Sequence, residues 1–403
     1  MNVREKYLEK IKKLLMVIEE NHIDMYFNIT KEELNEFVDE ILDKYKLEDD
    51  YDFFYISNVI IKKIFDKYDS HTMVVFKDRY IWLPIRFKIF DDKIYVINVD
   101  EDNKECLYGE LLQINGIDID VLKNEIEQRV CYSTKQWLYA SIEMNLCQLQ
   151  SILSLPSINN NSESINYTIL KEDGQQENVI YEPKDYELKF ATKYDFEPNI
   201  RKNYVYKIED DIMTIIYSSC HETYENQMIN FINEIESKST SNNISKYIVD
   251  IRGNTGGDST VIKPLIEFLK DKEVVTLVDG KVFSSGKFAI VDLKNIGSRF
   301  VGTEIGTTFN SFGNIVRREL DNFLVTISTK YFYYNDEESL IHGLESKEEL
   351  KEFKSHDENK KYFIPQEFEP SYYVENNLDD YKEHIDRMHE RAKELLSSNV
   401  KRY

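Results

Sequence analysis

The sequence predicts an α/β protein with a helical N-terminal part, a β-rich middle and an α/β C-terminal half. Apolar residues recur at helical spacing up to about residue 68, and segments rich in β-branched and aromatic side chains follow. In the second half, strand and helix patterns alternate. A chain of 403 residues is too long for one ordinary core. We therefore expect three domains, at residues 1–68, 69–185 and 186–403.

The N-terminal part is predicted to hold three helices. The first presents apolar residues at the spacing of one helix face: Leu8, Ile11, Leu14, Leu15 and Ile18. Thr30 followed by Glu33 is a capping box that opens a second helix, which runs to about Tyr45. A third helix is expected from about Phe53 to Tyr68. We interpret these helix faces as packing surface without chemistry.

The β-rich middle is predicted from runs of β-branched and aromatic residues at Thr72–Phe76, Tyr80–Phe90 and Lys93–Val99. Asn115-Gly116 lies between two apolar runs, which predicts a hairpin. The surrounding segment Gly109–Ile119 resembles the middle of a PDZ domain. An ordinary hairpin would have the same pattern and would carry no function.

The second half is predicted to contain crossover units. Two helices precede it, near Val121–Arg129 and over Lys135–Leu153. The alternating pattern then comprises strands at Tyr204–Ile208 and Ile212–Tyr217, a helix at Glu222–Ile235, a strand at Tyr247–Ile251, a helix at Ser259–Leu269, a strand at Val274–Val278 and a helix at Ser284–Asn295. This repetition implies crossover connections and a mostly buried sheet.

The charge balance limits the partners of the chain. With 74 acidic and 51 basic side chains the net charge is −23, and such a surface repels phosphate backbones and anionic lipids. We therefore expect no nucleic-acid and no membrane partner. The N-terminus lacks the apolar core of a signal peptide, and no apolar stretch approaches the roughly 20 residues that span a bilayer. These features predict a cytoplasmic protein.

Four cysteines are scattered along the chain without a C-x-x-C pair: Cys106, Cys131, Cys147 and Cys220. This spacing predicts free thiols in a reducing compartment rather than a disulfide framework or a zinc site. The sequence shows no metal site, and no cofactor is expected.

The first candidate for chemistry is the segment Asp250–Gly257, which reads D-I-R-G-N-T-G-G. It follows an apolar strand and precedes a helix. Backbone N–H groups beside its glycines can therefore point into one cavity, where the helix dipole favours negative charge. This arrangement suits an oxyanion hole. An ordinary strand-to-helix turn is the alternative, and the spacing fits neither the Walker pattern nor G-x-G-x-x-G of phosphate loops.

The second candidate is Ser284, in the run Val282–Ala289 after the next strand. The pattern puts this serine at the start of a helix, where its hydroxyl is exposed and the helix dipole stabilises a developing oxyanion. The N–H group of Ser285 is placed to donate to that oxyanion. A serine that only caps the helix is the alternative interpretation.

The third candidate is His71, in the run Asp69-Ser70-His71-Thr72 at the junction between the helical part and the first strand. A histidine near its ordinary pKa can accept a serine proton at neutral pH. The other six histidines, including His221 beside Cys220, are interpreted as surface or capping residues.

In this order, the three segments resemble the tail-specific (carboxy-terminal-processing) and tricorn-type serine peptidases, which carry D-x-H-T, D-x-R-x-N-x-G-G and F-S-S motifs. Two further segments are similar to that family: Val301–Thr307 to its G-E-x-T-x-G strand and turn, and Glu369–Val374 with Asp386 to its closing region. The resemblance covers roughly residues 30 to 390. It implies a crotonase-like or ClpP-like α/β core and hydrolysis of peptide bonds by a serine.

The resemblance assigns roles to residues of this chain. Ser284 takes the place of the nucleophile, and the N–H groups of Ser285 and of Gly256 or Gly257 take that of the oxyanion hole. One base used in the family is a lysine in the turn after the G-E-x-T strand. Thr308 stands at that position here, so the resemblance does not supply this base.

The other base in the family is the histidine of D-x-H-T, assisted by an adjacent serine and a distant glutamate. His71 and Ser70 match the first two. The family's glutamate lies a few residues before the closing proline, which favours Glu367, with Glu358 as the alternative. The charged stretch 335–361 is interpreted as an insertion.

The leading hypothesis is a serine endopeptidase acting on unfolded or extended polypeptides, which would pair with an exposed strand edge beside the nucleophile. One alternative is a non-catalytic member of the same fold that binds peptide or a small apolar ligand, and it predicts that Ser284 and His71 lie far apart. Another is a crotonase-type enzyme acting on an acyl thioester, which needs a basic coenzyme-A pocket of which the sequence gives no sign. The expected partner is a peptide or protein substrate, and oligomerisation is left open.

Overall fold

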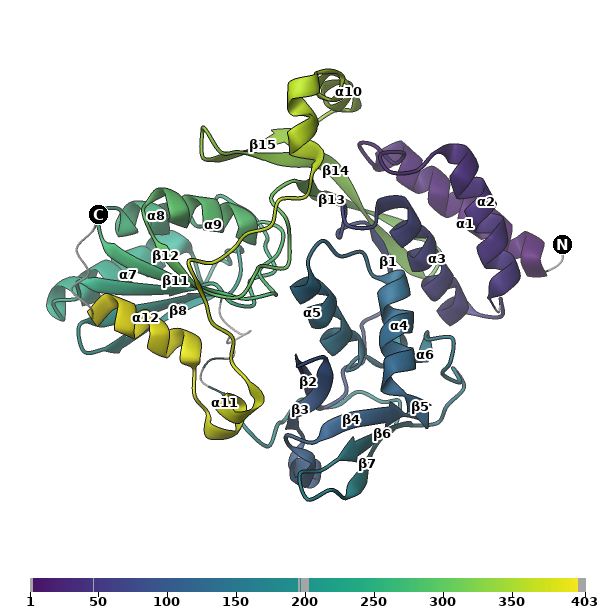
Figure 1. Ribbon diagram of the computed structural model, residues 1–403, viewed down its shortest axis with the longest axis horizontal. Coiled ribbons are helices and arrows are strands. Elements are labelled where there is room, and N and C mark those ends of the chain that lie inside the picture. The colour runs from purple at the N-terminus through teal and green to yellow at the C-terminus, as the bar shows by residue number, and fades with distance from the viewer. Residues whose placement is uncertain (1–2, 46, 195, 197–202, 398–403) are drawn as a thin grey trace.

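Three β-sheets and the helices around them make up the described part of the chain, which comprises residues 3–45, 47–194, 196 and 203–397 of this computed structural model (Figure 1). A six-stranded sheet forms the left-hand part of Figure 1, and a second sheet lies at lower right. The third runs between the first sheet and the N-terminal helices. The mixture of sheets and helices confirms the predicted α/β class.

Three helices form the N-terminal part, as predicted: α1 (Val3–Asn21), α2 (Lys31–Lys44) and α3 (Asp50–Phe65). The predicted capping box is present, because Glu33 N–H donates to Thr30 Oγ1 at 3.2 Å and Thr30 N–H donates to Glu33 Oε2 at 2.9 Å. The third helix ends before the expected Tyr68, since Asp66 adopts a positive φ of 44° that interrupts the helical backbone.

The middle sheet has the strand order β2-β3-β4-β6-β7, with β5 paired to β4. Its elements are β2 (Ile85–Phe90), β3 (Lys93–Val99), η1 (Glu101–Cys106), β4 (Glu110–Ile114), β5 (Ile117–Asp118), α4 (Ile119–Arg129), α5 (Lys135–Asn145), α6 (Leu149–Leu153), β6 (Ile165–Leu170) and β7 (Gln176–Tyr181). The hairpin predicted at Asn115-Gly116 is confirmed: Ile114 pairs with Ile117, and the two turn residues have φ angles of 50° and 77°.

Two predicted elements of this part are wrong for one shared reason. The expected strand Tyr80–Phe90 begins only at β2, and the expected helix Lys135–Leu153 is divided into α5 and α6. The residues before β2 instead bond to the chain between these two helices, where Leu83 N–H donates to Cys147 O at 2.9 Å. Backbone groups used in this bridge are not available to a continuous helix.

The six-stranded sheet has the order β16-β12-β11-β10-β9-β8, and its neighbours are parallel except for β8 and β9. Its elements are β8 (Tyr204–Glu209), β9 (Ile212–Tyr217), α7 (Met228–Ser241), β10 (Lys246–Asp250), α8 (Lys263–Leu269), β11 (Glu273–Val278), α9 (Gly286–Asn295), β12 (Arg299–Gly302), β16 (Tyr372–Tyr373), α11 (Leu378–Glu383) and α12 (Arg387–Ser397). Helices α7, α8 and α9 pack on one face and α12 on the other (Figure 1). The central strands are therefore buried on both sides, as predicted.

The three helices on the first face begin later than expected. Helix α7 follows a turn in which Met228 N–H donates to Glu222 Oε1 at 2.7 Å, so the chain from Glu222 is a cap rather than a helix. Helix α8 begins near Pro264, which suits a first turn, instead of at Ser259. Helix α9 begins after Ser284, which leaves that serine in the preceding turn.

The third sheet is antiparallel, with the order β1-β14-β13 and with β15 paired to β14. Its strands are β1 (Met73–Phe76), β13 (Ser311–Leu320), β14 (Phe323–Asn335) and β15 (Leu340–Leu344), followed by α10 (Lys347–Ser355) and η2 (Asp357–Phe363). The stretch 335–361, interpreted as an insertion, supplies β15, α10 and part of η2. The pairing of β1 with β14 brings His71, two residues before β1, close to the beginning of β13.

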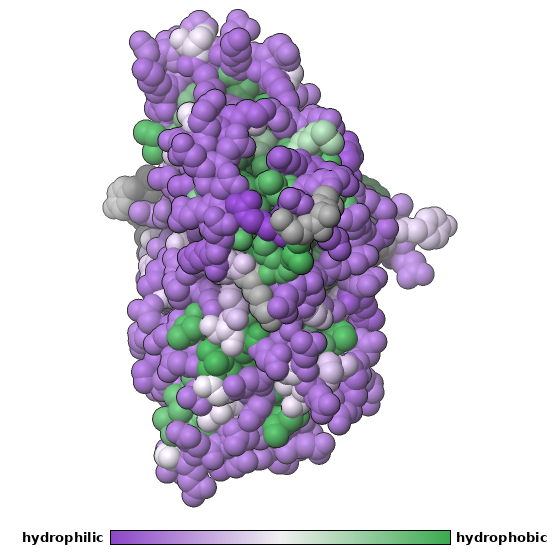
Figure 2. Space-filling view, turned by 90° about the vertical axis from the view of Figure 1, so that its right-hand side faces the viewer, coloured by the Kyte–Doolittle hydropathy of each residue, from purple (hydrophilic) through white to green (hydrophobic). Residues whose placement is uncertain are grey.

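Hydrophilic side chains cover most of the face shown in Figure 2, where hydrophobic ones occur in small separate groups. This agrees with the large negative charge of the sequence. None of the helices among the described residues is long and apolar enough to cross a membrane.

Candidate active site

Ser284 lies in a strained turn between strand β11 and helix α9. Its φ is 52°, in the left-handed region that costs an ordinary residue about 1–2 kcal/mol. The surroundings hold this turn in place, because a Cβ atom on Gly256 would lie 2.7 Å from both Ser284 Cβ and Ser285 N. The structure therefore brings together two of the segments that the sequence singled out.

The backbone donors of the glycine loop differ in what they bind. Gly256 N–H already donates to Asn254 Oδ1 at 2.9 Å. Across the residues that the structure describes, the N–H groups of Gly257 and Ser285 have no hydrogen-bond acceptor. The Ser285 hydroxyl donates to Gly257 O at 2.6 Å and ties the two turns together. Gly257 and Ser285 thus remain able to bind an oxyanion, whereas Gly256 serves to pack the loop.

His71 lies beside this turn, with its ring centre 4.5 Å from that of Phe283. Phe283 in turn stacks on Trp137 of α5, with ring centres 4.1 Å apart and planes 8° from parallel. Both ring nitrogens of His71 are buried and form no hydrogen bond of regular geometry among the described residues, although the backbone of Phe312 lies close enough to raise the pKa of the imidazole. His71 is a neighbour of Ser284, because its ring contacts Phe283, the residue before the serine. In the described part of the chain, however, no hydrogen bond joins the His71 ring to the Ser284 hydroxyl.

The carboxylate next to His71 is that of Asp69, whose Oδ1 lies 3.9 Å from His71 Nδ1. Asp69 is fully buried and accepts hydrogen bonds from the backbone N–H groups of His71 and Thr72, from Ser328 Oγ and from His22 Nε2. Burial alone would raise the pKa of Asp69, but its hydrogen bond to His22 and the charge of that histidine lower the pKa to about 2. Asp69 is therefore ionised at neutral pH and attracts a proton on His71 Nδ1.

Burial also governs the proton affinity of His71. It lowers the pKa of His71 to about 4, with Asp69 acting against this change and Lys287 adding to it. At pH 7 the imidazole is neutral, which is the form that accepts a proton. Ser70, the adjacent serine, is buried as well.

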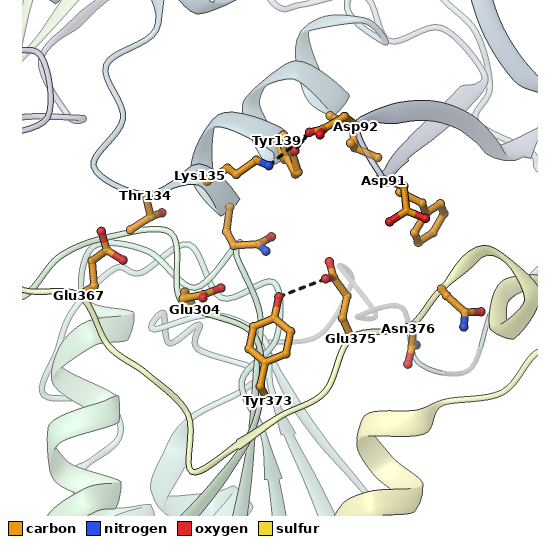
Figure 3. Close-up of a pocket in the computed structure, with 14 residues that line it drawn as sticks. Asp91, Asp92, Thr134, Lys135, Tyr139, Glu304, Glu367, Tyr373, Glu375 and Asn376 are labelled. Carbon is orange, nitrogen blue, oxygen red and sulfur yellow. Dashed lines mark hydrogen bonds and ion pairs between the residues drawn. The ribbon is translucent and has the colours of Figure 1, made fainter.

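The two glutamates considered for orienting His71 lie elsewhere. Glu367 is exposed and lines a cavity of about 510 Å³ (Figure 3). Glu358 is exposed in η2, where its carboxylate lies 3.9 Å from His356 Nδ1. Within the described ranges neither glutamate forms a hydrogen bond or ion pair with His71. The carboxylate that the sequence reasoning missed, Asp69, stands in the same motif as His71.

The cavity lies between α5 and loops at the end of the large sheet. In Figure 3, Thr134 and Lys135 lie on one side, opposite Glu304 and Glu367. Gln136, which also lines the cavity, directly precedes the tryptophan that stacks on Phe283. None of Ser284, His71 and Gly257 lines this cavity, which adjoins the candidate site only through the neighbouring residues Gln136 and Trp137 of α5.

Lys287 is a second residue that the sequence reasoning missed. It lies three residues after Ser284, and its Nζ donates to the carbonyl oxygens of Thr308 and Phe309 and to Ser311 Oγ. Thr308 is the position where the resemblance placed a lysine. Here a lysine from helix α9 reaches the same turn, and only its three-residue spacing from Ser284 was visible in the sequence.

No protein-family model matches the chain, and no curated protein sequence is similar enough to match it. Among solved structures, mature CPAF is similar over 98% of this chain and 96% of its own, with a TM-score of 0.64 and 11% sequence identity. The photosystem II D1 C-terminal processing protease covers 93% of this chain and 94% of its own, with a TM-score of 0.43 and 9% identity. The tricorn protease covers 98% of this chain and 37% of its own, with a TM-score of 0.43 and 14% identity.

These comparisons define the class of fold. The chain has the fold of mature CPAF over nearly its whole length. At this level of sequence identity the fold is what is shared, and the activity has to be argued from the site.

Proposed function

We propose that this chain is a serine peptidase of the tail-specific and tricorn type, an endopeptidase that hydrolyses peptide bonds in unfolded or extended polypeptides. One observation carries the proposal: Ser284, held at a φ of 52° before a helix, lies in contact with the glycine loop and beside a buried histidine whose ring nitrogens form no hydrogen bond of regular geometry among the described residues. A strained serine between a strand and a helix is typical of a nucleophile whose hydroxyl must be exposed.

In the proposed reaction Ser284 Oγ attacks the carbonyl carbon of the substrate, and His71 accepts the hydroxyl proton and later gives it to the leaving amine. Asp69 keeps a proton on Nδ1, which leaves Nε2 as the acceptor. The N–H groups of Gly257 and Ser285, at the start of α9, stabilise the oxyanion. A side-chain rotation must first bring His71 and Ser284 together, and such hydrogen bonds often tighten only in the substrate complex.

The proposal includes two assignments of structural parts, a crotonase-like core and a PDZ-like segment. The large parallel sheet with helices on both faces supports a crotonase-like core. The hairpin of β4 and β5, followed by α4, supports a PDZ-like segment. A catalytically inactive, peptide-binding member of the same fold is the second candidate, because no hydrogen bond joins Ser284 and His71 among the described residues.

The test is covalent labelling by a fluorophosphonate probe, which reacts with activated serines. We expect the native chain to be labelled, Ser284→Ala to show no labelling, and His71→Ala to react about 10²–10⁴-fold more slowly because the general base is lost. Matched controls are Ser298→Ala and His342→Gln, whose side chains bind Thr276 and Glu338 rather than a residue of the candidate site. Equal labelling of native chain and Ser284→Ala would contradict the assignment. A folded native chain that neither reacts nor cleaves unfolded protein would favour the inactive candidate.

A further inference from the structure

Lys287 is a buried lysine that has no carboxylate partner among the described residues. Its residue is 2% exposed, in the first turn of α9. The acceptors of its ammonium are two carbonyl oxygens, at 3.4 and 3.1 Å, and the hydroxyl of Ser311 at 2.8 Å. In the described part of the chain no carboxylate lies within ion-pair distance of Nζ. Burying an unpaired charge is costly, so the position calls for a functional explanation.

The buried cations of the chain differ in their partners, and Arg129 resembles Lys287 because it binds neutral acceptors on Ser154, Asn145 and Ser151. Arg252 is held by the carboxylates of Asp250 and Asp386 at 2.6 and 2.8 Å. Lys88, which is only half-buried, has the carboxylate of Glu143 at 3.4 Å. Lys287 differs from Arg252 and Lys88 because its acceptors are neutral, and its charge can therefore act on neighbouring groups.

His71 is the neighbour on which this charge acts. Ser311, which binds the ammonium, begins strand β13, and two residues later a Cβ atom on Gly313 would lie 3.6 Å from His71 Cε1. The same Cβ atom would lie 3.2 Å from the Phe332 ring, and Lys287 Nζ is 5.1 Å from the centre of that ring. The lysine and the histidine thus belong to one buried cluster.

Few charged groups share this cluster. The segment before β1 contributes His71 and Asp69, and the end of α1 contributes His22, which is bonded to Asp69. The turn 308–311 contributes neutral side chains, whereas the adjoining part of β14 carries Lys330, which pairs with Gly313 and binds the carboxylate of Glu345. Burial lowers the pKa of Lys287 to about 7. Burial lowers the pKa of His71 as well, and Asp69 opposes this change whereas Lys287 strengthens it.

We propose that Lys287 is a positioning residue that sets the proton affinity of His71 through its charge. The charged ammonium adds to the effect of burial, which keeps the imidazole neutral in the resting site. When Lys287 releases its proton to solvent, the imidazole becomes the better acceptor for the proton of Ser284. The catalytic consequence rests on the proposed function, whereas the electrostatic effect on His71 does not.

The first test measures the pKa of His71 directly, by NMR titration of histidine-labelled protein, with His71→Gln identifying the resonance. In Lys287→Met we expect the pKa of His71 to rise by about one pH unit, because a like charge is removed. Lys287→Gln, whose amide can still donate to the same acceptors, should give the same rise and serves if the Met variant does not fold. Lys294→Met, on the same helix and bonded to Tyr334, should leave the pKa of His71 unchanged. An unchanged His71 pKa in folded Lys287→Gln overturns the proposal.

The second test is the pH dependence of fluorophosphonate labelling. In the native chain the labelling rate should rise with pH through about 7, where Lys287 loses its proton. In Lys287→Gln that rise should move to lower pH, toward the titration of His71. A purely structural role for Lys287 would lower the rate at every pH and leave the midpoint in place, and that result overturns the proposal. If the native chain is not labelled at all, the proposed function fails while the NMR titration still decides on Lys287.

Discussion

Replacing Arg252 with methionine is expected to lower the free energy of unfolding by about 3–5 kcal/mol, the typical effect of removing one partner from a buried ion pair. The guanidinium forms four hydrogen bonds with two carboxylates, at 2.9 and 2.6 Å to Asp250 and at 2.9 and 2.8 Å to Asp386. The three side chains are only 7%, 10% and 17% exposed. Without the arginine, two buried carboxylates would face each other unpaired. Urea unfolding followed by circular dichroism measures the loss.

The matched control is Lys393→Met, which removes an exposed ion pair of 3.2 Å between α12 and Glu209 of β8. This variant should lose less than about 1 kcal/mol of unfolding free energy.

The pH dependence of the unfolding free energy is a second test of the Arg252 ion pair. Burial alone would raise the pKa of Asp386, but the charge of Arg252 outweighs it and lowers the pKa. The ion pair therefore stabilises the fold above the ordinary carboxyl pKa and is lost as the pH falls through the folded value. The difference between native and Arg252→Met should shrink as the pH falls below the ordinary carboxyl pKa, and a difference that grows in acid would contradict this assignment.

Local signals in the sequence were sufficient for the parts of the fold that depend on near neighbours. The capping box of Thr30 and Glu33 and the hairpin at Asn115-Gly116 form as predicted because each needs only three or four residues. The glycine loop and Ser284 meet as the order of strands and turns implied, since both follow adjacent parallel strands at the same edge of the sheet.

The parts that the sequence could not predict depend on contacts between distant segments. His22 lies 47 residues before Asp69, and no local pattern connects it to that carboxylate. Glu367 was favoured by its place before a proline, yet the chain carries it to an exposed position beside the cavity of Figure 3. No pattern in the sequence singles out Lys287, because its burial depends on how the turn after β12 folds back over α9. Charge partners and burial are set by tertiary packing rather than by spacing.

Gly256→Ala is expected to reduce fluorophosphonate labelling by at least about 10²-fold, comparable to the loss of an oxyanion donor. The added Cβ would lie 2.7 Å from Ser284 Cβ, 2.7 Å from Ser285 N and 3.0 Å from Phe283 O. All three atoms belong to the backbone of the serine turn or stand next to it, so none can move away without displacing Ser284. The φ of Gly256, 101°, adds strain that an alanine cannot relieve.

Gly297→Ala separates the clash from the backbone strain. Gly297 has a φ of 81° and no atom within 4 Å of the added Cβ, so this variant should cost about 1–2 kcal/mol of stability and keep its labelling rate. Circular dichroism and thermal unfolding establish that both variants are folded before their rates are compared. Labelling of folded Gly256→Ala at the native rate would mean that the glycine loop does not support Ser284. Loss of labelling in Gly256→Ala alone would show that the close contact between loop and serine, rather than the glycine backbone as such, keeps the nucleophile in its reactive position.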